Sequence, residues 1–175
     1  MDWNLTNNST ISTWSQRPTP GAFGVWNISY EEMIALSNES GDDMWITIPA
    51  LADDDYVKNL AALIHRELDP GLNVYVEYSN ETWNGVFAQY GQVLAMANAD
   101  YRVSATTDWA KIAQESALQI KRISDLFRGE FGDGFSRVLP VFSGFTLIPD
   151  FLTQGLSAVD RWYGAPSQYI KSAAV

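Results

Sequence analysis

The sequence contains no cysteine, a single histidine and few basic residues. The chain can therefore form neither a disulfide nor a thiolate metal site. His65 has no second histidine with which to share an ion, so a metal centre is not expected. Eleven lysines and arginines stand against 21 aspartates and glutamates, which gives a formal net charge of −10 at pH 7. This charge disfavours nucleic acids and anionic membranes as partners, because both bind to basic patches.

Long apolar runs and nucleotide-binding motifs are also missing. No stretch approaches the roughly 18 apolar residues of a membrane helix, and the N-terminal residues lack the basic-then-apolar pattern of an export signal. No GxGxxG or GxxxxGK[ST] pattern follows a predicted strand, and no cofactor is expected. Hydrophobic residues nevertheless make up 46% and aromatic residues 13% of the 175 residues, with seven tryptophans. These values predict one folded domain over residues 1–175.

Predicted strands and helices alternate along the chain. Short apolar segments at 44–49, 74–78 and 137–142 are typical of buried strands, and another begins near Ser172. Helical periodicity and capping signals predict helices over 30–40, 54–68, 87–97, 107–131 and 148–156. Strands that alternate with helices of this kind indicate βαβ units and a parallel sheet. The predicted fold class is therefore α/β, either a doubly wound sheet or a barrel.

Some conspicuous residues have a simple structural interpretation. Asp53, Asp54 and Asp55 stand at the start of the 54–68 helix, where carboxylates cap free N–H groups and complement the dipole. They are interpreted as a helix cap rather than a ligand site. Trp45, inside a predicted strand, is expected to belong to the core.

The stretch at 73–84, Asn-Val-Tyr-Val-Glu-Tyr-Ser-Asn-Glu-Thr-Trp-Asn, is the most informative. It opens with the β-branched and aromatic residues of a strand and ends in polar side chains around a tryptophan. In α/β folds ligands lie at the carboxyl ends of the strands. Glu81 is therefore the first candidate for chemistry, with Asn80, Trp83 and Asn84 beside it. The alternative is an exposed carboxylate that caps the segment after the strand.

Residues 78–84, Tyr-Ser-Asn-Glu-Thr-Trp-Asn, resemble the Asn-Glu signature of clan A glycoside hydrolases. In those (β/α)8 barrels the fourth strand ends in Asn-Glu, and the glutamate is the acid/base. The resemblance implies that Glu81 is the general acid/base of a retaining glycoside hydrolase. It also implies that Asn80 hydrogen-bonds the sugar 2-hydroxyl, a contact that strengthens in the transition state. Trp83 and Asn84 would line the cleft.

Further segments extend the resemblance over nearly the whole chain: Asp2-Trp3, Thr6-Asn7, Trp14 with Arg17-Pro18, and residues 51–57. Together with 73–84 they are similar to bacterial secreted barrel proteins labelled cellulose- or carbohydrate-binding. The resemblance implies an extracellular or periplasmic location for the parent protein. It also places Trp3, Trp14 and Arg17 on a long irregular loop at the same barrel face as Glu81, in contact with carbohydrate. Ala50 departs from the pattern, because a histidine is expected there.

By this resemblance the chain covers about strands two to six of a (β/α)8 barrel. Residues 1–3 would end strand two, and strand six would begin near Ser172. A barrel takes about 250 residues, so the chain is predicted to be an internal fragment, truncated at both ends. In clan A the nucleophile is a glutamate on strand seven, which such a fragment would lack. The fragment alone is therefore expected to be inactive.

Glu77 cannot replace that nucleophile. Four residues along one strand, at about 3.3 Å each, place it about 13 Å from Glu81. Paired carboxyl groups are about 5–5.5 Å apart in retaining enzymes and about 6.5–9.5 Å apart in inverting ones. Glu77 is predicted to lie inside the barrel, hydrogen-bonded or paired.

Two other interpretations stay open. The chain can belong to a non-catalytic carbohydrate-binding barrel protein, in which Glu81 only hydrogen-bonds sugar. It can also be a complete small α/β domain with a function unrelated to sugars. A glutamate at the end of strand seven would distinguish the enzyme from the binding protein.

Overall fold

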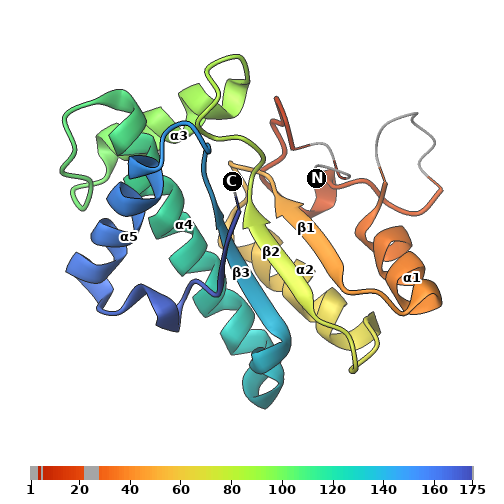
Figure 1. Ribbon diagram of the computed structural model, residues 1–175. Coiled ribbons are helices and arrows are strands. Elements are labelled where there is room, and N and C mark those ends of the chain that lie inside the picture. Colours follow the sequence, from red (N-terminus) through yellow and green to blue (C-terminus); the bar gives the residue numbers. More distant parts are fainter. Residues whose placement is uncertain (1–3, 5, 22–27, 175) are drawn as a thin grey trace.

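The computed structural model describes residue 4, residues 6–21 and residues 28–174 (Figure 1). Over these residues the helices are α1 (Tyr30–Ser40), α2 (Asp54–Glu67), α3 (Ala88–Ala99), α4 (Asp108–Phe131) and α5 (Asp150–Tyr163). The strands are β1 (Met44–Ile48), β2 (Val74–Tyr78), β3 (Val138–Ser143) and β4 (Ser172–Ala174). Short 3₁₀ helices are η1 (Trp14–Gln16), η2 (Gly132–Arg137) and η3 (Pro166–Gln168). The predicted α/β class is confirmed.

The described strands form one parallel sheet in the order β1-β2-β3-β4. Each strand lies beside the one before it in the sequence, and the register aligns Ile46 with Val76 and Val76 with Pro140. β4 pairs with the second half of β3, starting at Ser172 opposite Val141. The predicted parallel order is confirmed. Because all four strands point the same way, their carboxyl ends meet at one edge of the sheet, the upper edge in Figure 1.

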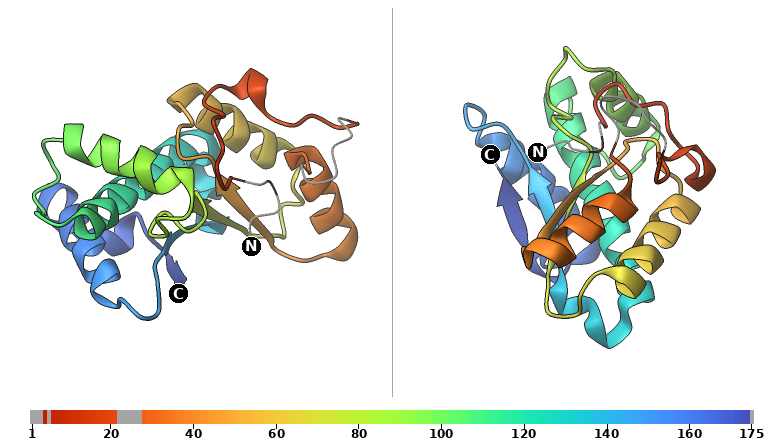
Figure 2. Two further views of the ribbon diagram at one scale, coloured as in Figure 1. Left: turned by 90° about the horizontal axis from the view of Figure 1, so that it is seen from above. Right: turned by 90° about the vertical axis from the view of Figure 1, so that its right-hand side faces the viewer.

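Helices α2 and α4 cover one face of this sheet, as the two views of Figure 2 show. Alternate strand residues point into that layer, and Ile46, Val76 and Phe142 are each at most 1% exposed. Helix α5 packs on the same side: a Cβ at Gly155 would lie 2.3 Å from Cζ of Phe142. The hydrophobic core therefore lies between the sheet and the layer formed by α2, α4 and α5.

The opposite face of the sheet carries the other set of strand residues. Trp45 and Tyr75 are register partners there, and their rings stack with centroids 5.2 Å apart. The indole N–H of Trp45 donates to Oε2 of Glu77 at 3.0 Å. The prediction that Trp45 belongs to the core is wrong, because it is half-buried on the face away from the helices.

The outer edge of β1 is covered by a side chain. Nδ2 of Asn4 donates to the carbonyl oxygen of Thr47 at 2.6 Å, and Oδ1 of Asn4 accepts from the Thr47 hydroxyl at 2.9 Å. The Thr47 N–H also donates to this Oδ1, at 3.4 Å. The asparagine amide thus presents a donor and an acceptor to the strand, as a neighbouring peptide group would.

The helix ends follow the predicted signals closely. Ser29 and Glu32 form a capping box at the start of α1. Asp53 accepts the N–H of Tyr56 at 2.7 Å, which confirms its role as a helix cap. Helix α5 continues well past its predicted end at residue 156, because Val159 is still buried against the core. The predicted strand at 1–3 lies outside the described residues, and no described helix is long and apolar enough to cross a membrane.

Candidate functional site

The backbone makes a strained bend directly after β2. Ser79 and Glu81 have φ values of 53° and 47°, in the left-handed region that non-glycine residues rarely adopt. Ser79 is fully buried, its N–H donates to the Ile48 carbonyl at 2.8 Å, and its hydroxyl has no partner. Such conformations cost about 1–3 kcal/mol each and gather at functional sites. The bend at 79–81 is therefore a candidate site on conformational grounds alone.

Glu81 lies half-buried at this bend, at the carboxyl edge as predicted. Its Oε2 accepts from Nδ2 of Asn84 at 2.8 Å, and its carbonyl accepts the Asn84 N–H at 2.9 Å. These two bonds close a turn that orients the carboxyl group. The structure thus brings Glu81 and Asn84 together, and the carboxylate retains further acceptor positions for a ligand hydroxyl.

Asn80 is held between this bend and the N-terminal segment. Its N–H donates to Oγ1 of Thr6 at 3.1 Å, and its Nδ2 donates to Oδ1 of Asn7 at 3.2 Å. Its carbonyl accepts from Nε2 of Gln89 at 2.6 Å. Both ends of the residue and its side chain are therefore fixed, and the side-chain orientation is set by Asn7.

The N-terminal segment lies along the carboxyl edge of the sheet. Oδ1 of Asn8 accepts the N–H of Ala88 at 2.8 Å, and the carbonyl of Ser9 accepts from Gln92 at 3.0 Å. The carbonyl of Ser12 accepts the N–H of Asp53 at 2.9 Å. The segment is thus tied to the starts of both α3 and α2.

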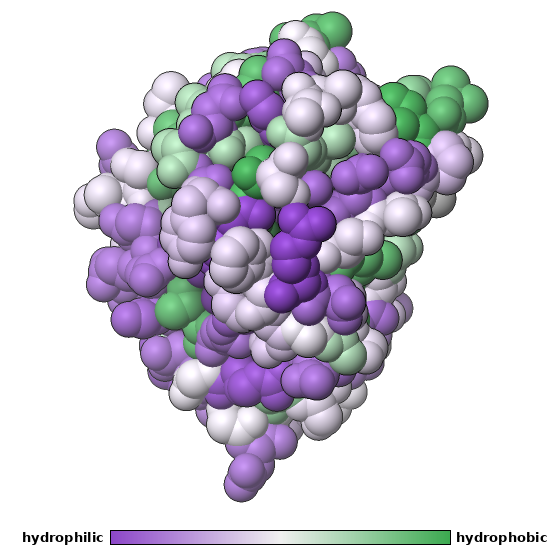
Figure 3. All heavy atoms as spheres, turned by 90° about the vertical axis from the view of Figure 1, so that its left-hand side faces the viewer, coloured by the Kyte–Doolittle hydropathy of each residue, from purple (hydrophilic) through white to green (hydrophobic). Residues whose placement is uncertain are grey.

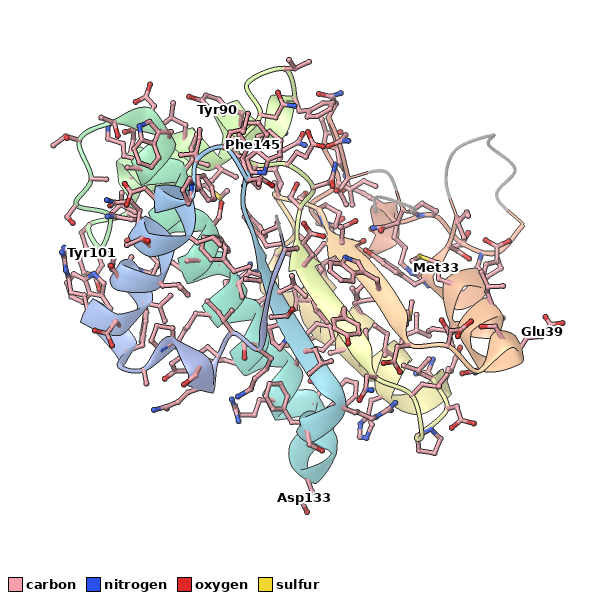
Figure 4. All side chains as sticks on the ribbon, viewed as in Figure 1. Met33, Glu39, Tyr90, Tyr101, Asp133 and Phe145 are labelled. Carbon is pink, nitrogen blue, oxygen red and sulfur yellow. The ribbon has the colours of Figure 1, made fainter. Side chains whose placement is uncertain are left out.

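Trp83 and Phe145 form an aromatic pair at the same edge. Their rings stack with centroids 4.5 Å apart and an interplanar angle of 15°. Trp83 follows β2 and Phe145 follows β3, so the pair bridges the loops after two neighbouring strands. Figure 4 shows Phe145 at the upper end of the sheet, and both rings are half-buried. Trp83 also packs against the hydrophobic core, so only part of the indole is exposed at this edge.

Trp14 and Arg17 lie in a cluster with α1 and α2. The Trp14 ring stacks on Tyr30 and meets Tyr56 edge-on, with centroids 6.4 Å and 5.4 Å apart. The Arg17 guanidinium lies 3.9 Å from the Trp14 ring centroid and 2.6 Å from Glu31. Burial raises the pKa of Tyr56 to about 12, so its hydroxyl stays neutral. Trp3, the third tryptophan that the resemblance implies, lies outside the described residues.

The prediction that Glu77 is hydrogen-bonded is confirmed. The side chain points to the face away from the helices, is 5% exposed and is hydrogen-bonded to Trp45. It therefore stabilises the strand pair rather than facing the bend at Glu81.

A second buried carboxyl group was not foreseen from the sequence. Glu115 of α4 is 1% exposed, and its Oε1 accepts from Nε2 of Gln119 at 2.7 Å. Burial raises its pKa, and the charge of Asp100 adds to this effect. The pKa of Asp100 is lowered by its hydrogen bonds from Arg102, which also bonds to Tyr163 of α5. This cluster joins α4, α5 and the α3–α4 connection.

Two further residues at the carboxyl edge escaped sequence reasoning. Gln89, fully buried in the first turn of α3, contacts both Asn80 and the N-terminal segment. Phe145 completes the pair with Trp83. Neither carries a motif, and only the position of Phe145 two residues after β3 could have suggested it.

Two hollows on the surface of the described residues lie away from the bend at 79–81. One, of about 290 Å³, lies between α1 and the start of β1, and another, of about 280 Å³, lies between α4, Arg102 and Tyr163. The face formed by α5 and the α3–α4 connection is largely hydrophilic (Figure 3). His65 stacks on Phe131, and the described residues contain no group of side chains suited to a metal ion. Comparison with family models, curated proteins and solved structures finds no match to this chain.

Proposed function

We propose that this chain binds carbohydrate at the carboxyl edge of its sheet, as part of a (β/α)8 glycoside hydrolase in which Glu81 is the general acid/base. The parent protein would act outside the cytoplasm, where polysaccharides are found. The proposal includes the finer fold: the four strands would be a segment of a closed barrel.

The sheet order supports the barrel. Each strand lies next to its predecessor in the sequence, so the strand order does not reverse anywhere across the described sheet. A doubly wound sheet reverses its order at a switch point and has helices on both faces, whereas a barrel adds strands in sequence and keeps its helices outside. Here α2, α4 and α5 share one face, and the other carries Trp45, Tyr75 and Glu77.

The single observation that carries the function is the Asn80–Glu81 pair on its strained bend. The two residues are consecutive in the sequence, at the carboxyl end of a parallel strand, and each side chain is oriented by a hydrogen bond. Trp83, stacked on Phe145, adds an aromatic ring two residues further along the same loop. An amide and a carboxyl group beside a ring suit a pyranose, which offers hydroxyls at its rim and an apolar face.

Binding without catalysis is the second candidate for this chain. Glu77, the other carboxylate of β2, is engaged with Trp45 on the open face of the sheet. At about 3.3 Å per residue it lies about 13 Å from Glu81, outside the range of either hydrolytic mechanism. A nucleophile would therefore have to come from residues beyond β2.

Binding is tested by isothermal titration of the chain with glucose-, xylose- and mannose-based oligosaccharides. We expect at least one series to bind, and Trp83→Ala and Asn80→Ala each to weaken it at least tenfold, which is about 1.4 kcal/mol. Trp162→Ala is the matched control, because this half-exposed tryptophan lies on α5 and bonds to Arg102. Absence of binding to every series, or equal losses in all three variants, would refute the proposal.

Catalysis is tested separately with aryl glycosides and polysaccharides. We expect no turnover by the 175-residue chain. Turnover that disappears in Glu81→Gln would show that a second carboxylate is present, and the binding-only alternative would then be wrong.

A further inference from the structure

Gln89 lies in the first turn of α3, and its side chain is fully buried, which is unusual for a glutamine. Oε1 accepts the N–H of Asn8 at 2.9 Å, and Nε2 donates to Oδ1 of Asn7 and to the carbonyl of Asn80. Both amide hydrogens and the oxygen are therefore used. Phe87, the residue before α3, provides no side-chain cap. The Gln89 side chain does not cap the helix either, because its partners lie in the N-terminal segment and in the bend after β2.

The three bonds of Gln89 meet at the bend after β2. Asn80, whose carbonyl Gln89 binds, lies between the left-handed residues Ser79 and Glu81. Asn7 accepts from both Gln89 and the Asn80 side chain. One glutamine amide thus reaches the backbone of the bend and the residue that orients its side chain. A strained backbone persists only where its surroundings over-determine it.

We propose that Gln89 is a positioning residue that holds the bend at 79–81 and the N-terminal segment in one frame, so that Asn80 and Glu81 face a sugar together. This inference rests on the proposed function, because it assigns Gln89 to the same site. Gln89 itself does not touch the ligand. It acts through the carbonyl of Asn80 and through Asn7.

Gln114 provides a control of the same chemistry. It is 5% exposed on α4, and its Oε1 accepts the N–H groups of Ser104 and Ala105 at 2.9 Å and 3.2 Å. It therefore also joins a helix to a loop through a buried amide. Its loop is the α3–α4 connection, away from the bend.

The experiment compares Gln89→Met with Gln114→Met, because methionine keeps the length of glutamine and removes its hydrogen bonds. Sugar affinity is measured by calorimetry with the tightest oligosaccharide of the panel, and stability by urea unfolding. The φ angles of Ser79 and Glu81 are followed by NMR couplings and chemical shifts. We expect both variants to lose stability. Only Gln89→Met should lose at least tenfold in sugar affinity and shift Ser79 and Glu81 out of the left-handed region.

The outcomes separate this inference from the proposed function. If the wild-type chain binds sugar and Gln89→Met binds as tightly as Gln114→Met, the positioning role is wrong and the binding proposal stands. If the wild-type chain binds no sugar, the NMR comparison decides: unchanged φ angles in Gln89→Met would overturn the inference.

A folding failure is also informative. Gln89→Glu keeps the acceptor for the Asn8 N–H and loses the two donor bonds, so it replaces Gln89→Met if that variant does not fold. If neither variant folds, Gln89 is a requirement for folding, and the positioning role is overturned.

Discussion

Substitution of Gly155 by alanine tests the packing of α5 on β3 and α4. Gly155 lies within α5, where α5 approaches both β3 and α4. A Cβ there would lie 2.3 Å and 2.5 Å from two ring carbons of Phe142 and 2.8 Å from the carbonyl oxygen of Ala113. The Phe142 ring is itself 1% exposed and packed on Phe151, so it has little room to move.

The magnitude follows from two opposed terms. Helix propensity favours alanine over glycine by about 0.8–1 kcal/mol. Overpacking in a well-packed core costs about 1–3 kcal/mol or more, and the Ala113 oxygen belongs to the backbone of α4 and cannot rotate away. We expect the steric term to dominate and Gly155→Ala to lower the free energy of unfolding by about 2 kcal/mol. For a chain of this size that corresponds to a melting temperature about 4–8 °C lower.

The assay is urea unfolding followed by tryptophan fluorescence and circular dichroism. Gly91→Ala in α3 is the control, because a Cβ there meets nothing within 4 Å, and it should gain about 0.5–1 kcal/mol. Phe142→Leu removes the crowded ring atoms, so the double variant Gly155→Ala with Phe142→Leu should lose less than the sum of the two single changes. If Gly155→Ala gains stability as Gly91→Ala does, the close contact of α5 with β3 and α4 is refuted.

Three further predictions concern the buried and strained groups. Burial raises the pKa of Glu115, so the folded state keeps a proton that the unfolded state releases. The free energy of unfolding therefore falls as pH rises above the ordinary pKa of glutamate. In urea unfolding, Glu115→Gln should have a higher free energy of unfolding than wild type at about pH 8 and the same value at about pH 4. Ser79→Gly should raise the melting temperature, with a gain of up to about 1 kcal/mol from relieved left-handed strain, and should weaken sugar binding in calorimetry because the bend loosens. Trp14→Ala should lower the free energy of unfolding by roughly 2–4 kcal/mol, as measured by urea unfolding.

The parallel order of the strands could be predicted because it depends on alternation, which a sequence displays. The face of the sheet to which a side chain points was harder to predict. Trp45 looks like core in a run of apolar residues, but strand parity places it with Tyr75 and Glu77 on the face without helices. Parity within β2 relates Glu77 to Tyr75, but the face on which Trp45 lies depends on the register between β1 and β2, which the sequence does not display.

The bend at 79–81 and its supports could not be predicted in the same way. From a sequence, left-handed φ values are expected at glycine and asparagine, but here they occur at Ser79 and Glu81. Gln89 looks like an ordinary exposed residue of a helix start, and its burial depends on a segment more than 70 residues earlier in the chain. Contacts between distant loops leave no local pattern.

The asparagines of the N-terminal segment hydrogen-bond groups of the sheet and of α3. Asn4, Asn7 and Asn8 each hydrogen-bond backbone or amide groups near the carboxyl edge. Asn4 serves the outer edge of β1, Asn7 receives Asn80 and Gln89, and Asn8 accepts the Ala88 N–H that Phe87 cannot cap. Asn8 itself has a φ of 59°, a conformation that asparagine tolerates. A polar, irregular segment that resembles a linker in composition is therefore part of the site's framework, because asparagine side chains carry the donor and acceptor pair of a peptide group.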